Sequence, residues 1–242
     1  MSTHTVLGKE VRVPVRIRLA HAFMATYSVP AAAAQRLIDY SGLEILRLPG
    51  VRAMCTLVFV DYIDGDLGPY NEFGVSFMIR HHTAAPDGAF GDLRALSAGR
   101  AGVFIHRLPV DGEFTLAAGR GIWGFPKEIA DFDAQHEGSV RRGVLHQSGQ
   151  LIVDLAIRTG LAVPQRRGGS SFDAYSHIDG VTRCTQWQMK PSGTHVRPGG
   201  AELALGEHDW ADELRSLGLP KRALMASAVD RLAMTFQDAT LV

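Results

Sequence analysis

Cysteine, lysine and net charge are the scarce features of this 242-residue sequence. The two cysteines, Cys55 and Cys184, lie far apart and outside any CxxC pair, so neither a disulfide framework nor a cysteine-rich zinc site is predicted. The 25 basic side chains balance the 25 acidic ones, which removes the usual electrostatic basis for binding nucleic acid or an anionic membrane. The expected partner is therefore a small molecule.

Long apolar runs are missing as well. No stretch approaches the roughly 18 apolar residues of a membrane-spanning helix, and the first residues, MSTHTVLGKEVRVPVRIRL, carry charges where a signal peptide has its apolar core. We therefore expect a cytoplasmic protein with no membrane partner. The length and the 46% hydrophobic composition fit a single globular domain over residues 1–242.

Period-two alternation dominates the chain and predicts a mainly β fold. The run VRVPVRIRL over residues 11–19 is typical of a half-buried strand, and its Pro14 favours a sheet edge. Further strands are predicted over residues 52–63, 73–79, 102–110, 113–118, 140–146, 151–158 and 222–242. Short strands separated by Gly, Asp, Asn and Pro favour an antiparallel sandwich or barrel.

Two short helices and one long loop interrupt the strands. A helix is expected from about Pro30 to Tyr40, before Gly42, and another over residues 208–218, which has an acidic first turn. Residues 163–180 are polar and rich in Gly and Ser, and we expect a surface loop or lid there. The predicted fold class is thus α+β, mainly β with a few short helices.

The segment GRGIWG (119–124) matches the G-x-G-x-x-G pattern of dinucleotide-binding folds. That pattern also needs a helix that begins at the third glycine, because the helix N-terminus holds the pyrophosphate. Phe125 and Pro126 follow instead, with no convincing amphipathic helix after them. We interpret the glycines as a tight, closely packed turn, and a nicotinamide enzyme as the weakest alternative.

One of only four lysines follows this turn. Lys127 comes after Trp123, Phe125 and Pro126, a setting that can desolvate an ammonium and favour the free amine. A free lysine amine attacks carbonyl carbon, whereas arginine cannot form an imine. On the residues alone, a surface lysine that extends over apolar neighbours remains the simpler interpretation.

The histidines predict no metal site. His81 and His82 end a predicted strand, where adjacent side chains point to opposite faces, so they are not expected to share an ion. His106 lies within another strand and is compatible with the lining of a cavity. A G-x-S-x-G nucleophile elbow is also missing from the sequence, which sets aside Ser/His/Asp chemistry.

The segment GRGIWGFPK resembles the segment that carries the reactive lysine of the acetoacetate decarboxylase family. The likeness covers most of the chain, since GPYNEFGVSF (68–77) is similar to the family's acidic segment and residues 201–236 are similar to its closing helix and strand. The resemblance implies an acetoacetate decarboxylase-like antiparallel β-barrel or sandwich and a homo-oligomer. It also implies an enzyme that uses no cofactor and acts on a keto acid or ketone.

Carried over residue by residue, the resemblance places Lys127 at the family's Schiff-base lysine and Glu72 at its catalytic carboxylate. Lys127 would form an iminium with a substrate ketone, and Glu72 would handle the proton at the enamine carbon. Without the family match, Glu72 is typical of a solvent-exposed turn glutamate. The other substrate-pocket candidates are Trp123, Phe125, Arg120, Glu128 and Arg18.

Two positions depart from the family pattern. The family's decarboxylases have a second lysine directly after the reactive one, and this chain has Glu128, whose charge would favour the ammonium if it lay close. Activation must then come from desolvation or from another cation, such as Arg120. The family's N-terminal arginine, which engages the substrate carboxylate, falls near Ala20, with Arg18 and His21 beside it.

Three functions follow from these observations. The first hypothesis is decarboxylation of an acetoacetate-like β-keto acid through an imine on Lys127. The alternative is an aldolase-dehydratase that acts on pyruvate or aldehyde substrates, because this chemistry shares every step up to the enamine. The third is a non-catalytic scaffold that keeps the cavity but does not activate its lysine, and Glu128 is the feature that favours it.

Overall fold

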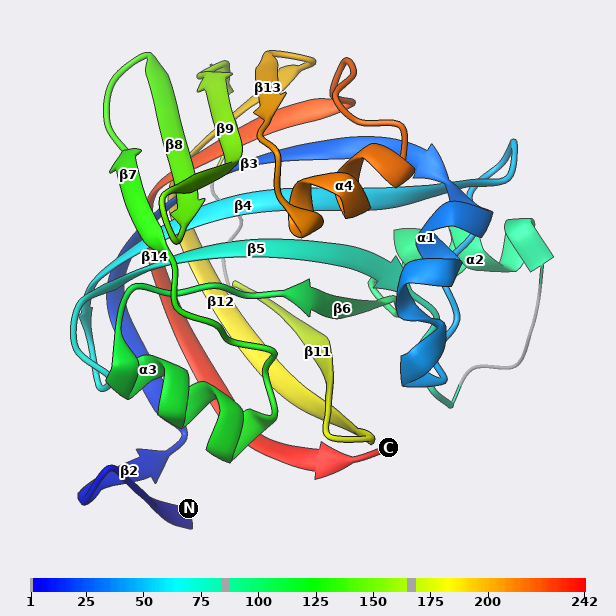
Figure 1. Cartoon of the computed structure of the whole chain (residues 1–242). Coiled ribbons are helices and arrows are strands. Elements are labelled where there is room, and N and C mark those ends of the chain that lie inside the picture. Colours follow the sequence, from blue (N-terminus) through cyan, green and yellow to red (C-terminus); the bar gives the residue numbers. More distant parts are fainter. Residues whose placement is uncertain (1, 84–87, 165–168) are drawn as a thin grey trace.

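A closed β-barrel forms the body of the computed structural model, which describes residues 2–83, 88–164 and 169–242 (Figure 1). Seven strands make the ring in the order β12, β11, β6, β5, β4, β3 and β14, and β14 pairs with β12 to close it. All neighbours are antiparallel except β6 and β11, which are parallel. The bounds are β3 Val15–Pro30, β4 Arg52–Gly65, β5 Tyr70–Ile79, β6 Gly102–Arg107, β11 Ser170–Ile178, β12 Val181–Pro198 and β14 Met225–Leu241.

A smaller sheet of four strands, in the order β13, β9, β8 and β7, covers the outer face of β3, β4 and β5 (Figure 1). Its strands are β7 Asp131–Gln135, β8 Val140–Gln147, β9 Gln150–Arg158 and β13 Ala201–Leu205. The two-residue strand β10 (Leu161–Ala162) extends the barrel sheet beside β12, and β1 (Ser2–Val6) pairs with β2 (Lys9–Val13). The helices are α1 Ala31–Ile38, α2 Gly88–Ser97, α3 Glu113–Ala118 and α4 Asp209–Ser216, with a 3-10 turn Asp39–Ser41 and a π-helical turn Gly119–Trp123.

The alternation of side chains along the strands builds two separate apolar cores. On β4, Phe59 packs in the outer core between the barrel and the smaller sheet, and its neighbour Val60 packs in the inner core. On β5, Phe73 likewise belongs to the outer core. Because successive strand residues point to opposite faces, Glu72 is directed into the barrel interior. The inner core therefore surrounds an acidic side chain.

The predicted mainly β barrel with a few short helices is confirmed. Alternation located β3, β4, β5, β8, β9 and β14, and the two predicted helices correspond to α1 and α4. Pro14 divides the strand expected over residues 11–19 into the end of β2 and the start of β3. In the three described ranges, no helix has the length and hydrophobicity needed to span a membrane.

One predicted strand is wrong, because residues 113–118 (EFTLAA) form α3. Leu116, Ala117 and Ala118 are strong helix formers. The helical period also places Thr115 and Ala118 on one buried side, three residues apart, whereas a strand would have turned them to opposite faces. The burial of this side outweighs the weak alternation in the sequence.

The loop expected over residues 163–180 is also wrong for most of its length, because residues 170–178 form β11. This strand lies between β6 and β12, so its backbone groups are paired on both sides. Its Ala174, Tyr175 and Ser176 are buried despite the polar composition of the segment. Residues 165–168 lie outside the described residues.

Candidate active site

Lys127 and Glu72 meet inside the barrel. Lys127 Nζ lies 2.9 Å from Glu72 Oε2, and the two side chains are only 3% and 6% exposed. Glu72 comes from β5, and Lys127 follows the π-helical turn. Val110 joins the two segments, because it bridges Glu72 on one side and Ile129 on the other. Main-chain pairing thus fixes how closely the amine and the carboxylate approach.

Further polar groups surround this ion pair. Lys127 Nζ donates a hydrogen bond to Thr115 Oγ1 at 2.8 Å, and Tyr62 donates its hydroxyl hydrogen to Glu72 Oε1 at 2.8 Å. Lys127 Nζ also lies 4.8 Å from the centroid of the Tyr70 ring, which stacks on Tyr62. Burial, followed by the charge of Glu72, raises the pKa of both tyrosines well above its usual value, so both remain protonated.

Sequence reasoning missed these three residues. Thr115 stands in the segment that was expected to be a strand, and its position three residues before Ala118 acquires a meaning only once α3 is recognised. Tyr62 and Tyr70 flank the turn between β4 and β5 and pair directly across the two strands. An aromatic pair that encloses the turn before Glu72 was the one signal available in the sequence.

A small cavity adjoins the ion pair. Its volume is about 10 Å³, close to the smallest space that holds one water molecule. The lining residues are Tyr62, Leu67, Tyr70, Glu72, Leu108, Trp123, Phe125, Lys127, Trp187 and Phe236. Lys127 and Glu72 are the charged members of this lining, and they are paired with each other. A substrate must therefore displace aromatic side chains to enter and must separate this ion pair to react.

The glycines before Lys127 form a π-helical turn that matches the expected close packing. The Phe125 N–H donates to the Gly119 carbonyl at 3.0 Å, and Gly124 ends the turn with a φ of 65°. The buried Trp123 donates from Nε1 to the Gln237 carbonyl at 2.8 Å, which attaches the turn to β14. Because a helix and not a strand precedes the glycines, the segment lacks the strand–turn–helix order of a dinucleotide site.

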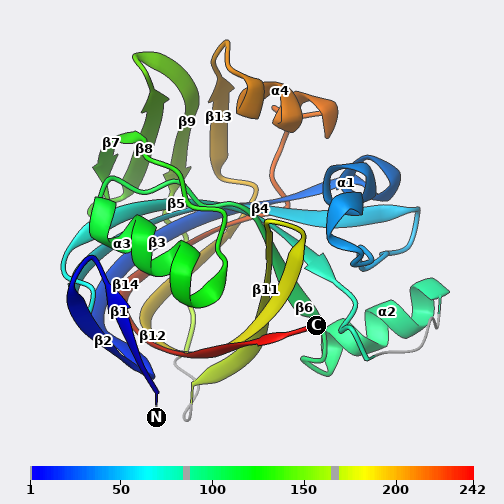
Figure 2. The ribbon, with the colours of Figure 1, turned by 60° about the horizontal axis from the view of Figure 1, so that its bottom comes forward.

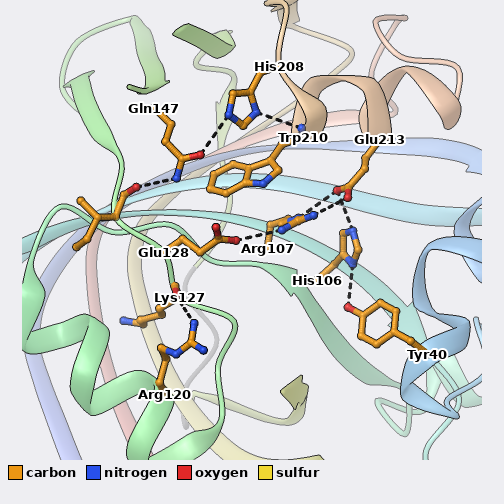
Figure 3. Close-up of polar contacts among 11 residues, drawn as sticks. Tyr40, His106, Arg107, Arg120, Lys127, Glu128, Gln147, His208, Trp210 and Glu213 are labelled. Carbon is orange, nitrogen blue, oxygen red and sulfur yellow. Dashed lines mark hydrogen bonds and ion pairs between the residues drawn. The ribbon is translucent and has the colours of Figure 1, made fainter. Parts of the chain in front are cut away.

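Glu128 is adjacent to Lys127 in the sequence but points elsewhere (Figure 3). Its Oε1 accepts a hydrogen bond from Arg107 Nη1 at 3.1 Å. Arg120, the other cation considered from the sequence, donates from Nη1 to the main-chain carbonyl of Lys127 at 3.2 Å. The acidic charge of Glu128 is thus balanced by Arg107, and Arg120 supports the backbone at Lys127.

Arg107 belongs to a wider polar network outside the Lys127 cavity (Figure 3). Glu213 of α4 accepts hydrogen bonds from Arg107 at 2.5 Å and contacts His106 Nε2 at 3.1 Å. His106 Nδ1 in turn lies 3.2 Å from the Tyr40 hydroxyl. Burial acts to raise the pKa of Glu213, but the bonds from His106 and Arg107 outweigh it and lower that pKa to about 2. His106 is therefore a member of this network and does not line the Lys127 cavity.

Arg18 does not join the site. It forms ion pairs with Asp64 at 2.6 Å and Asp66 at 2.7 Å, with 51% of its side chain exposed. Of the four other pocket candidates, Trp123 and Phe125 line the cavity, whereas Arg120 and Glu128 belong to the lysine segment and bond to the Lys127 carbonyl and to Arg107.

His81 and His82 lie beyond the end of β5, where strand geometry no longer separates them. Their rings are 4.5 Å apart, so the expected opposite orientation is wrong. His81 contacts Asp173 and His82 contacts the Tyr175 hydroxyl. Among the residues that the structure describes, no group of three or more His, Cys, Asp and Glu is arranged to hold a metal ion.

Comparisons with known proteins agree with this architecture. A family model described as acetoacetate decarboxylase matches residues 3–241. A stretch of 53 residues is 40% identical to acetoacetate decarboxylase 3 of Mesorhizobium japonicum, although this stretch spans only 22% of the chain and 21% of that relative.

Solved structures share the fold at low sequence identity. An acetoacetate decarboxylase from Legionella pneumophila superposes with a TM-score of 0.68 at 18% identity, over 95% of this chain and 87% of that one. The enduracididine biosynthesis enzyme MppR, complexed with the condensation product of pyruvate and imidazole 4-carboxaldehyde, superposes with a TM-score of 0.66 at 14% identity, over 96% and 90% of the two chains. From the match over residues 3–241, this chain belongs to the acetoacetate decarboxylase family.

Proposed function

We propose that this protein is a carbon–carbon lyase that forms an imine between Lys127 and a keto acid, with decarboxylation of a β-keto acid as its reaction. The observation that carries the proposal is the pairing of a lysine amine, 3% exposed, with a carboxylate at 2.9 Å among aromatic side chains. A buried lysine is costly unless it has a use or a partner. Here the partner is a group that can also accept its proton.

The proposed reaction begins with proton transfer from the Lys127 ammonium to Glu72. The free amine then adds to the substrate ketone, and loss of water gives an iminium. The electron pair of the bond to the carboxylate moves toward the iminium nitrogen, carbon dioxide leaves, and an enamine remains. Protonation of the enamine carbon and hydrolysis of the imine return the amine and release a ketone.

Glu72 is suited to both proton steps. It lies at hydrogen-bonding distance from Nζ, so it can take the proton that the amine must lose and return a proton to the enamine carbon. The bond from Tyr62 orients its second oxygen, and because Tyr62 remains protonated this bond persists while Glu72 is charged.

The lining of the cavity favours the loss of carbon dioxide. A carboxylate that leaves water for aromatic walls loses solvation, whereas neutral carbon dioxide does not. Among the described lining residues, the one cation is the reactive lysine itself. In this proposal, burial among aromatic rings replaces the second lysine of the family's decarboxylases, because Glu128 pairs with Arg107 outside the cavity.

An aldolase-dehydratase reaction is the second candidate. The specific observation behind it is the fold shared with MppR, whose structure holds the condensation product of pyruvate and an aldehyde. Pyruvate bound to Lys127 as an iminium would lose a methyl proton to Glu72, and the resulting enamine would attack the aldehyde carbon; loss of water and hydrolysis of the imine would complete the reaction. Measurement of carbon dioxide release distinguishes the two reactions.

Borohydride trapping tests the proposal. The protein is incubated with acetoacetate, pyruvate or a ketone, reduced, and analysed by intact mass and peptide mapping, with Lys127→Ala and Lys221→Ala as matched variants. A substrate-sized adduct on Lys127 that persists in Lys221→Ala and is absent from Lys127→Ala is the expected result. Folded protein that gives no adduct with any carbonyl would contradict the mechanism and favour a non-catalytic binding scaffold. The chain has only four lysines, so the modified residue can be assigned unambiguously.

A further inference from the structure

The strand β12 carries a row of three polar side chains on its inner face, Arg183, Thr185 and Trp187, which we call the β12 row. Their direct partners on β11 are Ser176, Ala174 and Phe172. Directly paired residues of neighbouring strands share a face, and both Ala174 and Phe172 pack in the inner core. The β12 row therefore faces the barrel interior, along the wall that β11, β12 and β14 form in Figure 2.

Each member of the β12 row has a buried polar atom without a hydrogen-bond partner in the described part of the chain. These atoms are Arg183 Nη1, Thr185 Oγ1 and Trp187 Nε1. Arg183 also takes part in none of the ion pairs found among the described residues. An unpaired buried donor is costly, and native proteins satisfy nearly all of them. Three in a single row indicate a shared ligand.

The β12 row borders the lysine site at both of its ends. Trp187 lines the Lys127 cavity and contacts the Phe125 ring, with centroids 5.7 Å apart. Arg183 lies against Gly124, where an added Cβ would be 2.5 Å from Nη1 and 3.1 Å from Cζ. Gly124 ends the turn that precedes Lys127. The β12 row therefore continues from the wall of the Lys127 cavity at Trp187 to the turn before Lys127 at Arg183.

The chemistry of the β12 row matches a carboxylate. Guanidinium, hydroxyl and indole N–H groups can all donate to its oxygens, and the bond from arginine is assisted by charge. Lys127 is already paired with Glu72, and Arg18, which lies outside the site, is paired with Asp64 and Asp66. Trp187 lines the Lys127 cavity, whereas Arg183 lies farther along β12 against Gly124. The carboxylate bound by Arg183 is therefore a different group from the one that leaves as carbon dioxide.

We infer that the β12 row binds a second carboxylate of the substrate, with Arg183 as a specificity-determining residue, so that the substrate is a β-keto diacid. This inference rests on the proposed function. The carboxylate that leaves as carbon dioxide remains in the aromatic cavity, and the distant carboxylate anchors the molecule on Arg183. Remote binding energy of this kind positions the reacting atoms without stabilising the group that must leave.

Stable products of such a reaction provide the probes. Loss of carbon dioxide from the six-carbon and eight-carbon β-keto diacids leaves levulinate and 6-oxoheptanoate. Pentan-2-one and heptan-2-one have the same carbon chains without the carboxylate. Borohydride trapping on Lys127 is compared within each acid and ketone pair for the wild type, Arg183→Gln, Thr185→Val and Arg197→Gln. Arg197 is an exposed arginine on the same strand and serves as the matched control.

The wild type and Arg197→Gln are expected to trap at least one keto acid about tenfold to hundredfold better than its matching ketone, the range expected for hydrogen bonds to a charged group. Arg183→Gln should lose this preference while trapping the ketone as before, and Thr185→Val, which preserves shape, should lose part of it. An unchanged preference in Arg183→Gln, or equal loss for acid and ketone, would overturn the inference, as would a wild type that traps ketones without preferring the acids.

A second measurement separates the inference from the proposed function. Isothermal titration of levulinate and 6-oxoheptanoate into Lys127→Ala protein measures carboxylate binding where no imine can form. Tighter binding to Lys127→Ala than to the double variant Lys127→Ala/Arg183→Gln supports the carboxylate site even if trapping shows no imine in the wild type. Equal binding to the two, or none to either, would discard the site. Occupation of the β12 row by water alone gives this last result.

Discussion

Gly119 provides the sharpest test of how the structure holds Lys127. A methyl group added at this position would lie 2.5 Å from Lys127 Cδ, 2.6 Å from Cε and 3.2 Å from Cγ. The backbone itself accepts alanine, since Gly119 has φ and ψ angles of −61° and −45°. Gly121, in the same turn, is the matched control, because no atom of the described residues beyond its chain neighbours and its own turn's backbone lies within 4 Å of the added methyl group.

Two opposing effects set the expected magnitude for Gly119→Ala. Replacing glycine by alanine in a helical turn stabilises by about 1 kcal/mol, and overpacking in a filled interior destabilises by about 1 to 3 kcal/mol. The Lys127 side chain is not free to move aside, because its Nζ donates a hydrogen bond to Thr115 at 2.8 Å and forms an ion pair with Glu72 at 2.9 Å. The methyl group must therefore displace the amine, and a shift of about 1 Å costs on the order of 100-fold in rate.

The assay compares imine trapping and urea unfolding for the wild type, Gly119→Ala and Gly121→Ala. We expect a small change in the free energy of unfolding for Gly119→Ala, with trapping on Lys127 reduced by one to two orders of magnitude. Gly121→Ala should trap like the wild type and be no less stable. Trapping by folded Gly119→Ala within twofold of the wild type would refute the claim that Gly119 fixes the position of the amine.

Two further predictions concern stability at low pH. Burial lowers the pKa of His136 to about 4, below the ~6.5 of an unfolded histidine. The unfolded chain therefore takes up the proton first as the pH falls. The free energy of unfolding then decreases by on the order of 3 kcal/mol between about pH 6.5 and pH 4. His136→Phe keeps a ring against Phe23 and should remove this loss in urea unfolding at pH 7 and pH 4.5. The pKa of Glu213, about 2, is instead below the ~4.3 of an unfolded glutamate, so its contribution, on the order of 3 kcal/mol, is full above pH 4.3 and disappears toward pH 2. Glu213→Gln should remove this acid-dependent part, and an unaltered pH profile would show that His106 and Arg107 do not stabilise the carboxylate.

Local pattern was sufficient for the parts of the fold where one strand face is buried. β4 and β9 are rich in apolar residues, buried positions largely alternate with less buried ones along them, and both were located from the sequence. β11 was not, because its Ser, Asp and His residues are typical of a loop. Pairing with β6 and β12 supplies the hydrogen bonds that make this segment a strand. Pairing between strands that are far apart in the chain produces no regular pattern of apolar residues within the segment itself.

The candidate site divides in the same way. Lys127 and Glu72 were named because their segments resemble a family, and the structure brings the two side chains together. Thr115 could not be named, since no motif surrounds it, and Tyr62 had no signal beyond its spacing from Tyr70 across the turn before Glu72; the closed barrel places both residues at the ion pair. The orientation of Glu128 toward Arg107 was equally beyond the sequence, because a neighbouring position in the chain does not say which way a side chain points.

The closing strand β14 has a consequence for the order of events during synthesis of the chain. It lies between β3 and β12, so a ribosome that has completed only residues 1–224 has produced two barrel strands with unpaired facing edges. The same strand supplies Phe236 to the cavity wall and the Gln237 carbonyl that holds Trp123. A nascent chain, or one that ends early, therefore contains Lys127 without the part of the cavity wall that β14 supplies. The surroundings of Lys127 are therefore complete only once β14 has been synthesised and paired.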